Sequence, residues 1–233
     1  MTIYHFCNDT FGTPFPPVSA AFAKKHGVKI VRVLSVKPET STLRSLELAV
    51  RRPVGVALRR TRRLLEGAPP HGEDLPTLYV TNVNSPDFRN LIKAGDAGVI
   101  TGFNQIFSSE TIERFRSFAN LHPSILPLYR GPVPTYWQLR NDEQRTGFTL
   151  HKVAPKIDAG EPLYQKVVAV DGETSLFELA RKVALAAVPV FRRYLHYIAF
   201  GGRWVPRYVD AYKVYRTHLN YASFPEPQAK SHG

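Results

Sequence analysis

Cysteine is nearly absent from this sequence, and its scarcity excludes two kinds of structure. Cys7 is the single cysteine, so the chain can form no internal disulfide and no cysteine-rich metal site. Cys7 lies in an apolar stretch, where it is most simply a small core residue. We therefore expect no metal, and the lack of disulfides favours a cytoplasmic location.

Long apolar runs are absent as well. No segment reaches the ~18 to 20 residues that a membrane-spanning helix needs. The first six residues lack the basic and then apolar regions of a signal peptide. The 233 residues, 43% of them hydrophobic, are enough for one sizeable core. The sequence therefore predicts a globular protein without a membrane span.

Acidic residues are scarce relative to basic ones, 19 against 31, which gives a net charge of +12. This balance favours anionic partners such as phosphates, nucleotides, nucleic acid or an acidic membrane surface, and the plain alternative is a solvated basic surface. Much of the charge falls in a basic helical insertion that we place at 39–75. Docking on the body, contact with anionic lipid and binding of a phosphorylated substrate all stay open for it.

Short strands and helices alternate along the rest of the chain. We expect strands at 2–7, 28–36, 77–81, 97–101, 118–122, 146–153 and 162–170. Helices are expected at 16–26, after Ser85, from Ser108 or Ser109 through 115, at 134–140, and from the Ser175–Glu178 capping box to about 197. This rhythm predicts an α/β fold: an open, Rossmann-like, mostly parallel twisted sheet with helices on both faces.

We expect one domain over residues 1–203, with the basic insertion at 39–75, followed by an aromatic C-terminal tail over 204–233. The tail is rich in tyrosine and spaced by prolines. It is expected to lie on the body of the protein or on an oligomer partner, so a homodimer is expected.

The most informative stretch begins at Asn120 and runs to Gly131. Residues two apart in a strand point to the same face, and Pro123 favours the extended conformation of His122, so Asn120 and His122 are expected to share one small volume. An amide beside an imidazole suits a developing oxyanion and a moving proton. Taken alone, a histidine before proline is more often structural, and the asparagine could cap a turn.

Asp158 lies in a loop between Pro155 and Gly160. A carboxylate beside an imidazole raises the pKa of the imidazole and orients its ring. Together the three side chains can run acyl chemistry without a protein nucleophile, because an attacking amine would supply that role. The plain alternative for Asp158 is an Asx-turn.

Three stretches carry a family resemblance: N-L-H-P-S-I-L-P-L-Y-R-G at 120–131, T-G-F-T-L-H at 146–151, and I-D-A-G at 157–160. They resemble the folate-dependent formyltransferase family, and 102–106 matches it more loosely. The resemblance covers about 76–170, with a weaker echo at 11–15. It implies transfer of a formyl group from 10-formyltetrahydrofolate to a primary amine, by direct attack through a tetrahedral intermediate.

The resemblance also implies roles for particular residues. Asn120 would hydrogen-bond the formyl oxygen, His122 would stabilise that charge or accept the amine's proton, and Asp158 would hold His122 and a bridging water. His151 is interpreted as a structural or supporting residue. The pterin of the donor would lie against two loops and be held largely by backbone groups, at Phe103, Asn104, Gln105, Ile106, Phe107, Val153, Ala154, Pro155 and Lys156.

The acceptor stays open. A single-domain sugar N-formyltransferase, acting on a nucleotide-linked amino sugar, fits the length and the basic surface. A glycinamide ribonucleotide enzyme would want a glycine-rich phosphate loop, which 8–14 does not provide. Methionyl-tRNA enzymes carry a further C-terminal barrel, and formyltetrahydrofolate hydrolases usually carry an extra N-terminal domain, so neither is favoured. We expect the acceptor to meet Asn8, Thr10, Thr13, Tyr129 and Arg130.

The partners expected are therefore a small, phosphorylated amine and a second copy of the chain, with no nucleic acid. Contact with a membrane surface through the basic insertion stays open. A different class also has to be weighed, namely a basic nucleic-acid or membrane-surface binding protein on an inactive formyltransferase fold. The intact Asn120, His122 and Asp158 argue against it.

Overall fold

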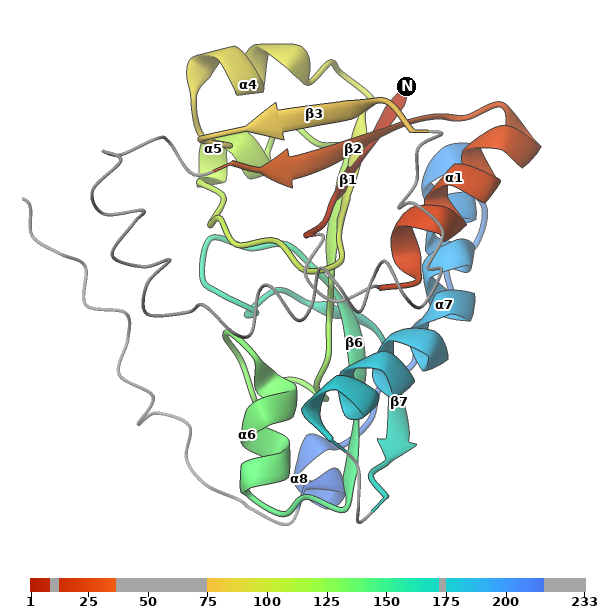
Figure 1. The fold of residues 1–233 in the computed structure, drawn as a ribbon. Coiled ribbons are helices and arrows are strands. Elements are labelled where there is room, and N and C mark those ends of the chain that lie inside the picture. Colours follow the sequence, from red (N-terminus) through yellow and green to blue (C-terminus); the bar gives the residue numbers. More distant parts are fainter. Residues whose placement is uncertain (9–12, 37–74, 172–174, 216–233) are drawn as a thin grey trace, which may run out of the picture.

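A computed structural model describes residues 1–8, 13–36, 75–171 and 175–215. Seven strands form one sheet in the order β3-β2-β1-β4-β5-β6-β7 (Figure 1). The first five strands pair in parallel, whereas β6 and β7 are antiparallel at one edge. The strands are β1 (Thr2–Phe6), β2 (Lys29–Ser35), β3 (Thr77–Val80), β4 (Ala97–Ile100), β5 (Ser117–His122), β6 (Arg145–Lys152) and β7 (Pro162–Ala169). The predicted open, mostly parallel sheet is confirmed.

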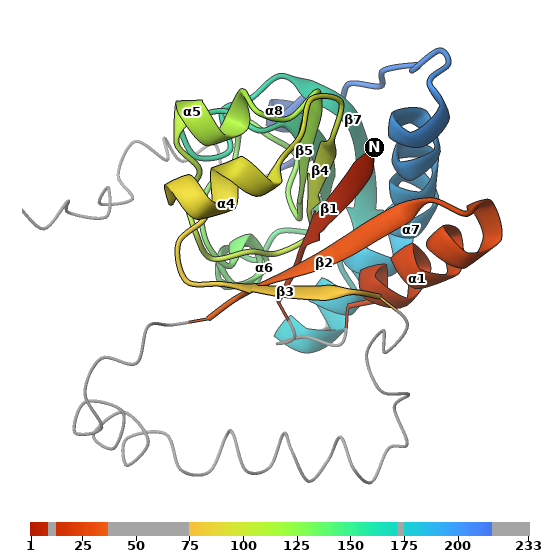
Figure 2. The same cartoon turned by 90° about the horizontal axis from the view of Figure 1, so that it is seen from above.

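Helices cover both faces of the sheet, as predicted (Figure 2). The helices are α1 (Phe15–His26), α4 (Pro86–Leu91), α5 (Ser109–Ile112), α6 (Pro134–Arg140), α7 (Leu176–Phe200) and α8 (Ala211–Val214). α1 and α7 pack against each other over one face, where Ile3 and Phe191 belong to the main apolar cluster. α4 and α5 lie on the other face, over a second cluster centred on Phe6.

Local capping explains where several helices begin. The Ser85 hydroxyl accepts a hydrogen bond from the N–H of Phe88 at the start of α4. Ser175 and Glu178 form the expected capping box at the start of α7. The α5 helix is shorter than predicted: it ends at Ile112, whereas the prediction extended it to residue 115. The chain continues to Phe115 through tight turns. These turns bring the Phe115 ring into the second cluster, where it packs on Phe6 at a centroid distance of 6.0 Å.

The described part of the aromatic tail, 204–215, lies on the body of the protein. The indole N–H of Trp204 donates to the carbonyl of Leu163 at 3.0 Å, and the N–H of Gln165 donates to the carbonyl of Arg207 at 2.8 Å. The Tyr215 hydroxyl accepts a hydrogen bond from the N–H of Ile125 at 2.8 Å. The predicted basic insertion lies outside the described residues except for its last member, Leu75.

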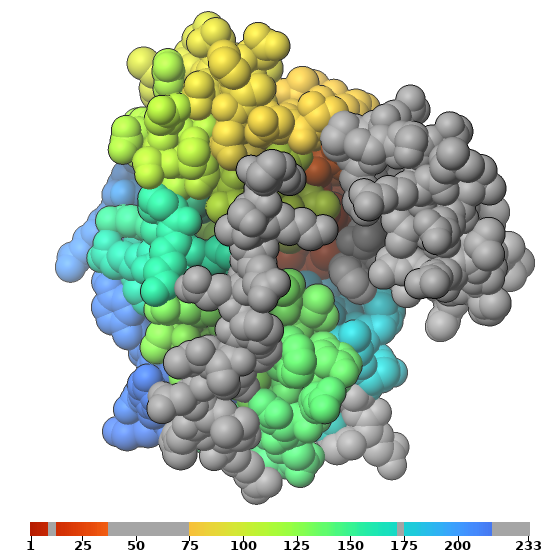
Figure 3. All heavy atoms as spheres, turned by 90° about the vertical axis from the view of Figure 1, so that its left-hand side faces the viewer, coloured from red at the N-terminus to blue at the C-terminus, as the bar shows by residue number. Residues whose placement is uncertain are grey.

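Segments that follow three neighbouring strands reach one face of the molecule. In Figure 3 the yellow-green surface after β4, the green surface after β5 and the teal surface around the β6–β7 loop lie on this face. Polar residues at such strand ends are where ligands commonly bind in open α/β sheets. Within the described residues, no helix is long and apolar enough to cross a membrane.

Candidate active site

Strand β5 presents an amide and an imidazole on one face of the sheet. Asn120 and His122 are two residues apart in the strand, so their side chains point the same way. β5 lies between β4 and β6, which places this pair inside the sheet and away from its edges. In β6, His151 lies directly opposite Asn120. Three polar side chains thus meet beside Phe118, which belongs to the second apolar cluster.

Asp158 reaches this pair from the loop between β6 and β7. The loop is tightly constrained at Gly160, where an added Cβ would lie 1.8 Å from the carbonyl oxygen of Lys152, so only glycine fits. Asp158 itself has a left-handed φ of 47°, a conformation that aspartate tolerates better than most residues. Its carboxylate accepts a hydrogen bond from the N–H of Gly131 at 2.8 Å. Backbone groups therefore fix the position of the carboxylate.

The carboxylate contacts both members of the β5 pair. The amide of Asn120 donates to Oδ1 at 3.1 Å, and His122 Nδ1 lies 3.4 Å from Oδ2. Burial alone would raise the pKa of the Asp158 carboxyl, but the facing His122, the contact with His151 and the N–H of Gly131 hold it at about 2. Asp158 is therefore ionised at neutral pH. We refer to Asn120, His122 and Asp158 as the polar trio.

The second ring nitrogen of His122 fixes the tautomer. Nε2 lies 2.7 Å from the carbonyl oxygen of Tyr129, and a carbonyl can only accept, so Nε2 carries a proton. In the neutral ring Nδ1 then has a free lone pair directed at Asp158. Burial lowers the pKa of His122 below its ordinary value, although Asp158 and the Tyr129 bond oppose this effect. The site can therefore take up one proton at Nδ1 and hold it beside a carboxylate.

His151 fixes the amide of Asn120. His151 Nδ1 lies 2.8 Å from the carbonyl of Lys152, so it is the donor nitrogen and Nε2 is an acceptor in the neutral ring. That Nε2 lies 3.2 Å from the Asn120 amide nitrogen and 3.4 Å from Asp158 Oδ1. Both N–H groups of Asn120 therefore point at acceptors, which agrees with the interpretation of His151 as a supporting residue.

The first loop predicted to meet the donor, Phe103–Phe107, is divided between core and surface. The Phe107 ring is buried and packs on Phe6 at 5.0 Å, and the half-buried Phe103 packs on Phe6 at 5.3 Å. Gln105 uses its amide to bind Ser35 on β2 at 2.7 Å and the main chain after β3. These side chains hold the loop in place, so what the loop offers a ligand at Gln105 and Phe107 is main chain.

The exposed members of the two predicted donor loops lie beside the second cluster. In the first loop, Asn104 and Ile106 are exposed, and Ile106 is 59% accessible. In the second loop the four predicted residues form the start of the segment that ends at Asp158, with Pro155 and Lys156 exposed and Val153 and Ala154 half-buried. Val153 packs against the second cluster, to which Phe103 also belongs, so the two loops share one apolar base.

Tyr129 does not fit its predicted contact with the acceptor. Its side chain is 1% exposed and packs on Tyr215 at 4.7 Å, and its hydroxyl donates to Glu143 at 2.7 Å. A positive φ of 57° turns the ring into this apolar cluster while the carbonyl faces His122. We therefore correct the sequence prediction: the part of Tyr129 that reaches the site is its carbonyl oxygen.

The other residues predicted to meet the acceptor are dispersed. Burial is the main cause that lowers the pKa of His122, and the positive charge of the exposed Arg130 adds a smaller lowering. Asn8 is half-buried after β1, and Thr13 is half-buried before α1 with a buried hydroxyl that has no partner among the described residues. Thr10 lies outside the described residues. Arg130 is therefore the predicted acceptor residue with a visible electrostatic link to the polar trio.

Two contributions to the site come from main-chain groups that the sequence does not mark. The carbonyl of Tyr129 sets the tautomer of His122, and the N–H of Gly131 binds Asp158. Both lie in the segment after His122 that the sequence motif includes, but nothing in the side chains predicts which carbonyl or N–H turns inward. Sequence reasoning missed both.

Known proteins share this fold. A family model described as formyl transferase matches residues 17–195. The chain is similar to the phosphoribosylglycinamide formyltransferase of Coxiella burnetii in complex with CHES, with a TM-score of 0.56 and 19% identity over 86% of this chain and 88% of that one.

Two sugar enzymes are similar to the same degree. A sugar N-formyltransferase from Shewanella sp FDAARGOS_354 has a TM-score of 0.57 and 18% identity over 95% of this chain and 74% of that one. WlaRD, a sugar 3N-formyl transferase studied in the presence of dTDP and 5-N-formyl-THF, has a TM-score of 0.56 and 17% identity over 89% and 66%. At such identities the likeness to solved structures shows the fold alone. The family match, in contrast, spans well over half of the 233 residues and includes the whole polar trio, so the chain belongs to the formyl transferase family and is a formyltransferase.

Proposed function

We propose that this enzyme transfers the formyl group of 10-formyltetrahydrofolate to the primary amine of a small anionic acceptor, a nucleotide-linked amino sugar. The observation that carries the proposal is the polar trio: an ionised carboxylate with a donor amide 3.1 Å away and the free lone pair of a neutral imidazole 3.4 Å away. This set suits acyl transfer in which the attacking nucleophile comes from the substrate.

Asn120 is the residue that stabilises the oxyanion in this proposal. When the amine nitrogen attacks the formyl carbon, the carbonyl electron pair moves onto the formyl oxygen. The Asn120 amide nitrogen, whose N–H groups now face Asp158 and His151, donates one of them to that oxygen. Loss of one such donor typically slows a reaction ~10²- to 10³-fold.

His122 and Asp158 handle the proton. The lone pair on His122 Nδ1 accepts the proton that the attacking amine loses, and the resulting imidazolium forms an ion pair with Asp158 across the existing 3.4 Å contact. The same proton then passes to the folate nitrogen as the bond between that nitrogen and the formyl carbon breaks. The products are a formamide and tetrahydrofolate, and the trio returns to its starting state.

The donor is proposed to lie against the two loops 103–107 and 153–156. Their shared apolar base suits a flat pterin ring, and main chain held by Gln105 and Phe107 offers hydrogen bonds along the edge of that ring. WlaRD, which has a similar fold, was studied with 5-N-formyl-THF. This supports a folate donor here.

The anionic character of the acceptor rests on Arg130 and on the net charge of +12. An amino sugar is preferred to glycinamide ribonucleotide because the turn at 8–14 is not glycine-rich. Solved proteins of similar fold include enzymes of both kinds, so the acceptor has to be found by experiment. A homodimer and a cytoplasmic location stay predictions of the sequence.

The test is a screen of amines with 10-formyltetrahydrofolate and the purified chain, following both tetrahydrofolate release and formylated product. Nucleotide-linked amino sugars, glycinamide ribonucleotide, methionyl-tRNA and water alone form the arms of the screen. Product with an amino sugar supports the proposal, and product with another arm assigns the acceptor to that class. No tetrahydrofolate release in any arm would exclude the proposed reaction.

A further inference from the structure

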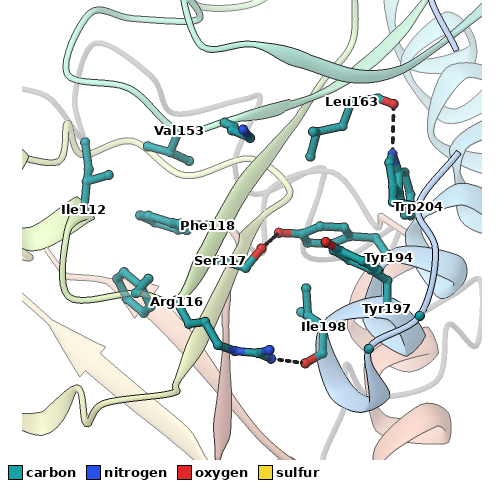
Figure 4. A pocket seen from close by; sticks show the side chains of 14 residues that line it. Ile112, Arg116, Ser117, Phe118, Val153, Leu163, Tyr194, Tyr197, Ile198 and Trp204 are labelled. Carbon is teal, nitrogen blue, oxygen red and sulfur yellow. Dashed lines mark hydrogen bonds between the residues drawn. The ribbon is translucent and has the colours of Figure 1, made fainter. Parts of the chain in front are cut away.

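A cavity lies at the other end of β5 from His122. This cavity has a volume of about 580 Å³, and Figure 4 shows side chains that line it, among them Ser117 and Phe118 of β5 and Tyr197 of α7. We call it the β5-edge cavity. It is lined by Ile112, Phe115, Arg116, Ser117, Phe118, Lys152, Val153, Leu163, Tyr194, Tyr197, Ile198, Gly201, Gly202 and Trp204.

Aromatic rings form much of the lining. Trp204 lies at 90° to Tyr194 with ring centres 5.8 Å apart, and at 58° to Tyr197 with centres 5.5 Å apart. The polar atoms of two rings are already bonded within the body, since Trp204 donates to Leu163 and the Tyr194 hydroxyl bonds Ser117 at 2.9 Å (Figure 4). Tyr194 is fully buried and the Arg193 guanidinium lies 4.4 Å from the centre of the Trp204 ring, so the half-buried Tyr197 and the remaining surface of Trp204 are what these three rings offer the cavity.

The charge around the cavity is positive. Arg116 and Lys152 are among the lining residues, which include no aspartate or glutamate. The charge of Lys152 is offset by Glu161 at 2.6 Å, whereas Arg116 has no acidic partner among the described residues. One amino group of Arg116 donates to the carbonyl of Ile198 at 2.5 Å and contacts the Met1 sulfur. Its Nε and other amino group make no hydrogen bond within the described residues, and a guanidinium carries five donors.

We propose that the β5-edge cavity binds an aromatic anion, a planar ring joined directly or through a linker to a carboxylate or a phosphate, at a site separate from the polar trio. The ring would pack on Trp204 and Tyr197, where edge and face contacts between aromatic groups are favourable. The anion would bind the free edge of the Arg116 guanidinium, which matches the fork of two carboxylate or phosphate oxygens. The volume lies within the usual range for small-molecule sites.

The cavity lies beside the polar trio along the same strand. Phe118 lines the cavity and Asn120 is two residues further on, a step of about 7 Å in a strand. Val153 also lines it and begins the loop that leads to Asp158. No member of the trio and no residue of 103–107 takes part in the lining. Val153 also belongs to the proposed donor loop 153–156, so the two sites are neighbours that share this residue, and the test must separate them.

The chain contains two tryptophans, so a Trp137→Phe background leaves Trp204 as a fluorescent reporter inside the cavity. Two probes represent two sources of an aromatic anion: adenosine monophosphate for free nucleotides, and 4-aminobenzoyl-glutamate for the tail of a folate. Adenosine serves as the uncharged match of the first probe. We expect at least one of the two anions to change Trp204 emission in a saturable way. If that anion is adenosine monophosphate, its dissociation constant should be at least tenfold lower than that of adenosine.

Variants assign the binding to the cavity. Arg116→Gln is expected to weaken it about tenfold or more, whereas Arg114→Gln, an exposed arginine outside the lining, changes it less than twofold. Tyr197→Ala is expected to weaken it as well, with Tyr212→Ala as its control, and melting curves check that each variant is folded. Binding should persist when 5-formyltetrahydrofolate saturates the proposed donor site.

Three results would overturn the proposal. Emission that stays constant up to millimolar concentrations of both anions means that the cavity binds neither source. Equal effects of the Arg116 and Arg114 substitutions on affinity would mean that the probe responds to the net positive charge of the surface and makes no specific contact with Arg116. Displacement of the probe by 5-formyltetrahydrofolate means that the cavity is part of the donor site. Because binding is read without turnover, failure here leaves the proposed formyl transfer untouched.

Discussion

Two buried histidines in this protein differ in the chemistry of their partners. His5 in β1 is fully buried and bonds a hydroxyl with each ring nitrogen, Ser19 at 2.9 Å and Thr101 at 2.8 Å. His122 in β5 is 5% exposed and bonds a carbonyl on one side while it faces Asp158 on the other. A hydroxyl can accept or donate, so two hydroxyls satisfy both nitrogens of a neutral ring, but they supply no negative charge that would stabilise an imidazolium.

The electrostatic surroundings of the two rings differ in the same sense. Burial lowers the pKa of His5 to about 3, with Arg32 on the neighbouring strand adding to the effect. Burial also lowers the pKa of His122, but Asp158 opposes the change. A buried imidazole whose hydrogen-bond partners are neutral therefore links β1, α1 and the residue that follows β4, whereas the same group beside a carboxylate can receive a proton. We therefore infer that the partner, more than the burial, decides which of the two histidines can take part in the proposed reaction.

The largest expected effect comes from exchanging the two rings for amides. His122→Asn should lower kcat about 10³-fold, because general base catalysis contributes 10²–10⁴, and should shift the melting temperature by only a few degrees. His5→Gln should leave kcat within twofold and lower stability by roughly 1–3 kcal/mol, since a buried hydroxyl loses its partner. Turnover and thermal unfolding are measured on both variants. A fully active His122→Asn enzyme would refute the proposed mechanism.

Asp158→Asn makes the surroundings of His122 resemble those of His5. The amide keeps the size of the side chain and can still accept from Gly131, but it removes the charge that would stabilise an imidazolium. We expect kcat to fall at least ~10²-fold with a folded protein. Steady-state kinetics beside circular dichroism checks this. Retention of more than a tenth of the activity would show that the charge of Asp158 is dispensable.

His5 and Asp158 should contribute to the pH dependence of the free energy of unfolding in different pH ranges. A folded-state pKa of about 3 for His5 means that below its ordinary pKa of 6.5 the unfolded chain binds a proton that the folded chain does not. Stability therefore falls as pH falls from 6.5 towards 3, by up to about 1.4 kcal/mol per pH unit from this group.

His5→Gln should flatten that part of the curve. Asp158 acts lower, because its pKa drops from 3.8 unfolded to about 2 folded, so its contribution is lost as pH falls from about 4 to 2. Denaturant unfolding at a series of pH values measures both windows. A His5→Gln slope equal to that of the parent between pH 6 and 4 would mean that another group dominates acid unfolding.

The smallest effect tests the correction made for Tyr129. Tyr129→Phe removes the hydroxyl that donates to the buried Glu143 but keeps the ring and the carbonyl. We expect a loss of about 1–3 kcal/mol in stability, because the Glu143 carboxyl and the Asn141 amide both lose a hydrogen-bond partner, and unchanged KM for the acceptor. Chemical denaturation and kinetics together decide. A raised KM with normal stability would return Tyr129 to the acceptor site.

Local patterns explain why much of the fold could be predicted. Alternating or continuous apolar runs gave the seven strands to within a residue or two at each end, and Ser85 and Ser175 marked two helix starts through their capping side chains. The motif placed Asn120, His122 and Asp158 together because strand period and family resemblance agree. Where short-range sequence decides the conformation, the sequence was sufficient.

Long-range packing explains what could not be predicted. The ring of Tyr129 turns away from the site because Tyr215 and Glu143 receive it, and Gln105 is held by Ser35, 70 residues away. The contact of His151 with Asn120 depends on the register between β5 and β6, which no local pattern gives. The end of α5 at Ile112 follows from the place that Phe115 takes in the second cluster.

The contact between Tyr129 and Tyr215 also has a consequence for the order of events in synthesis. The Tyr215 hydroxyl accepts a hydrogen bond from the N–H of Ile125, which is synthesised 90 residues earlier. Its ring packs on that of Tyr129, the residue whose main-chain carbonyl sets the His122 tautomer. A nascent chain can form β5 long before Tyr215 leaves the ribosome, but it cannot complete the support of Tyr129. We therefore expect the sheet to form during translation, and the support of the proposed catalytic residue His122 to be complete only after the segment around Tyr215 has docked.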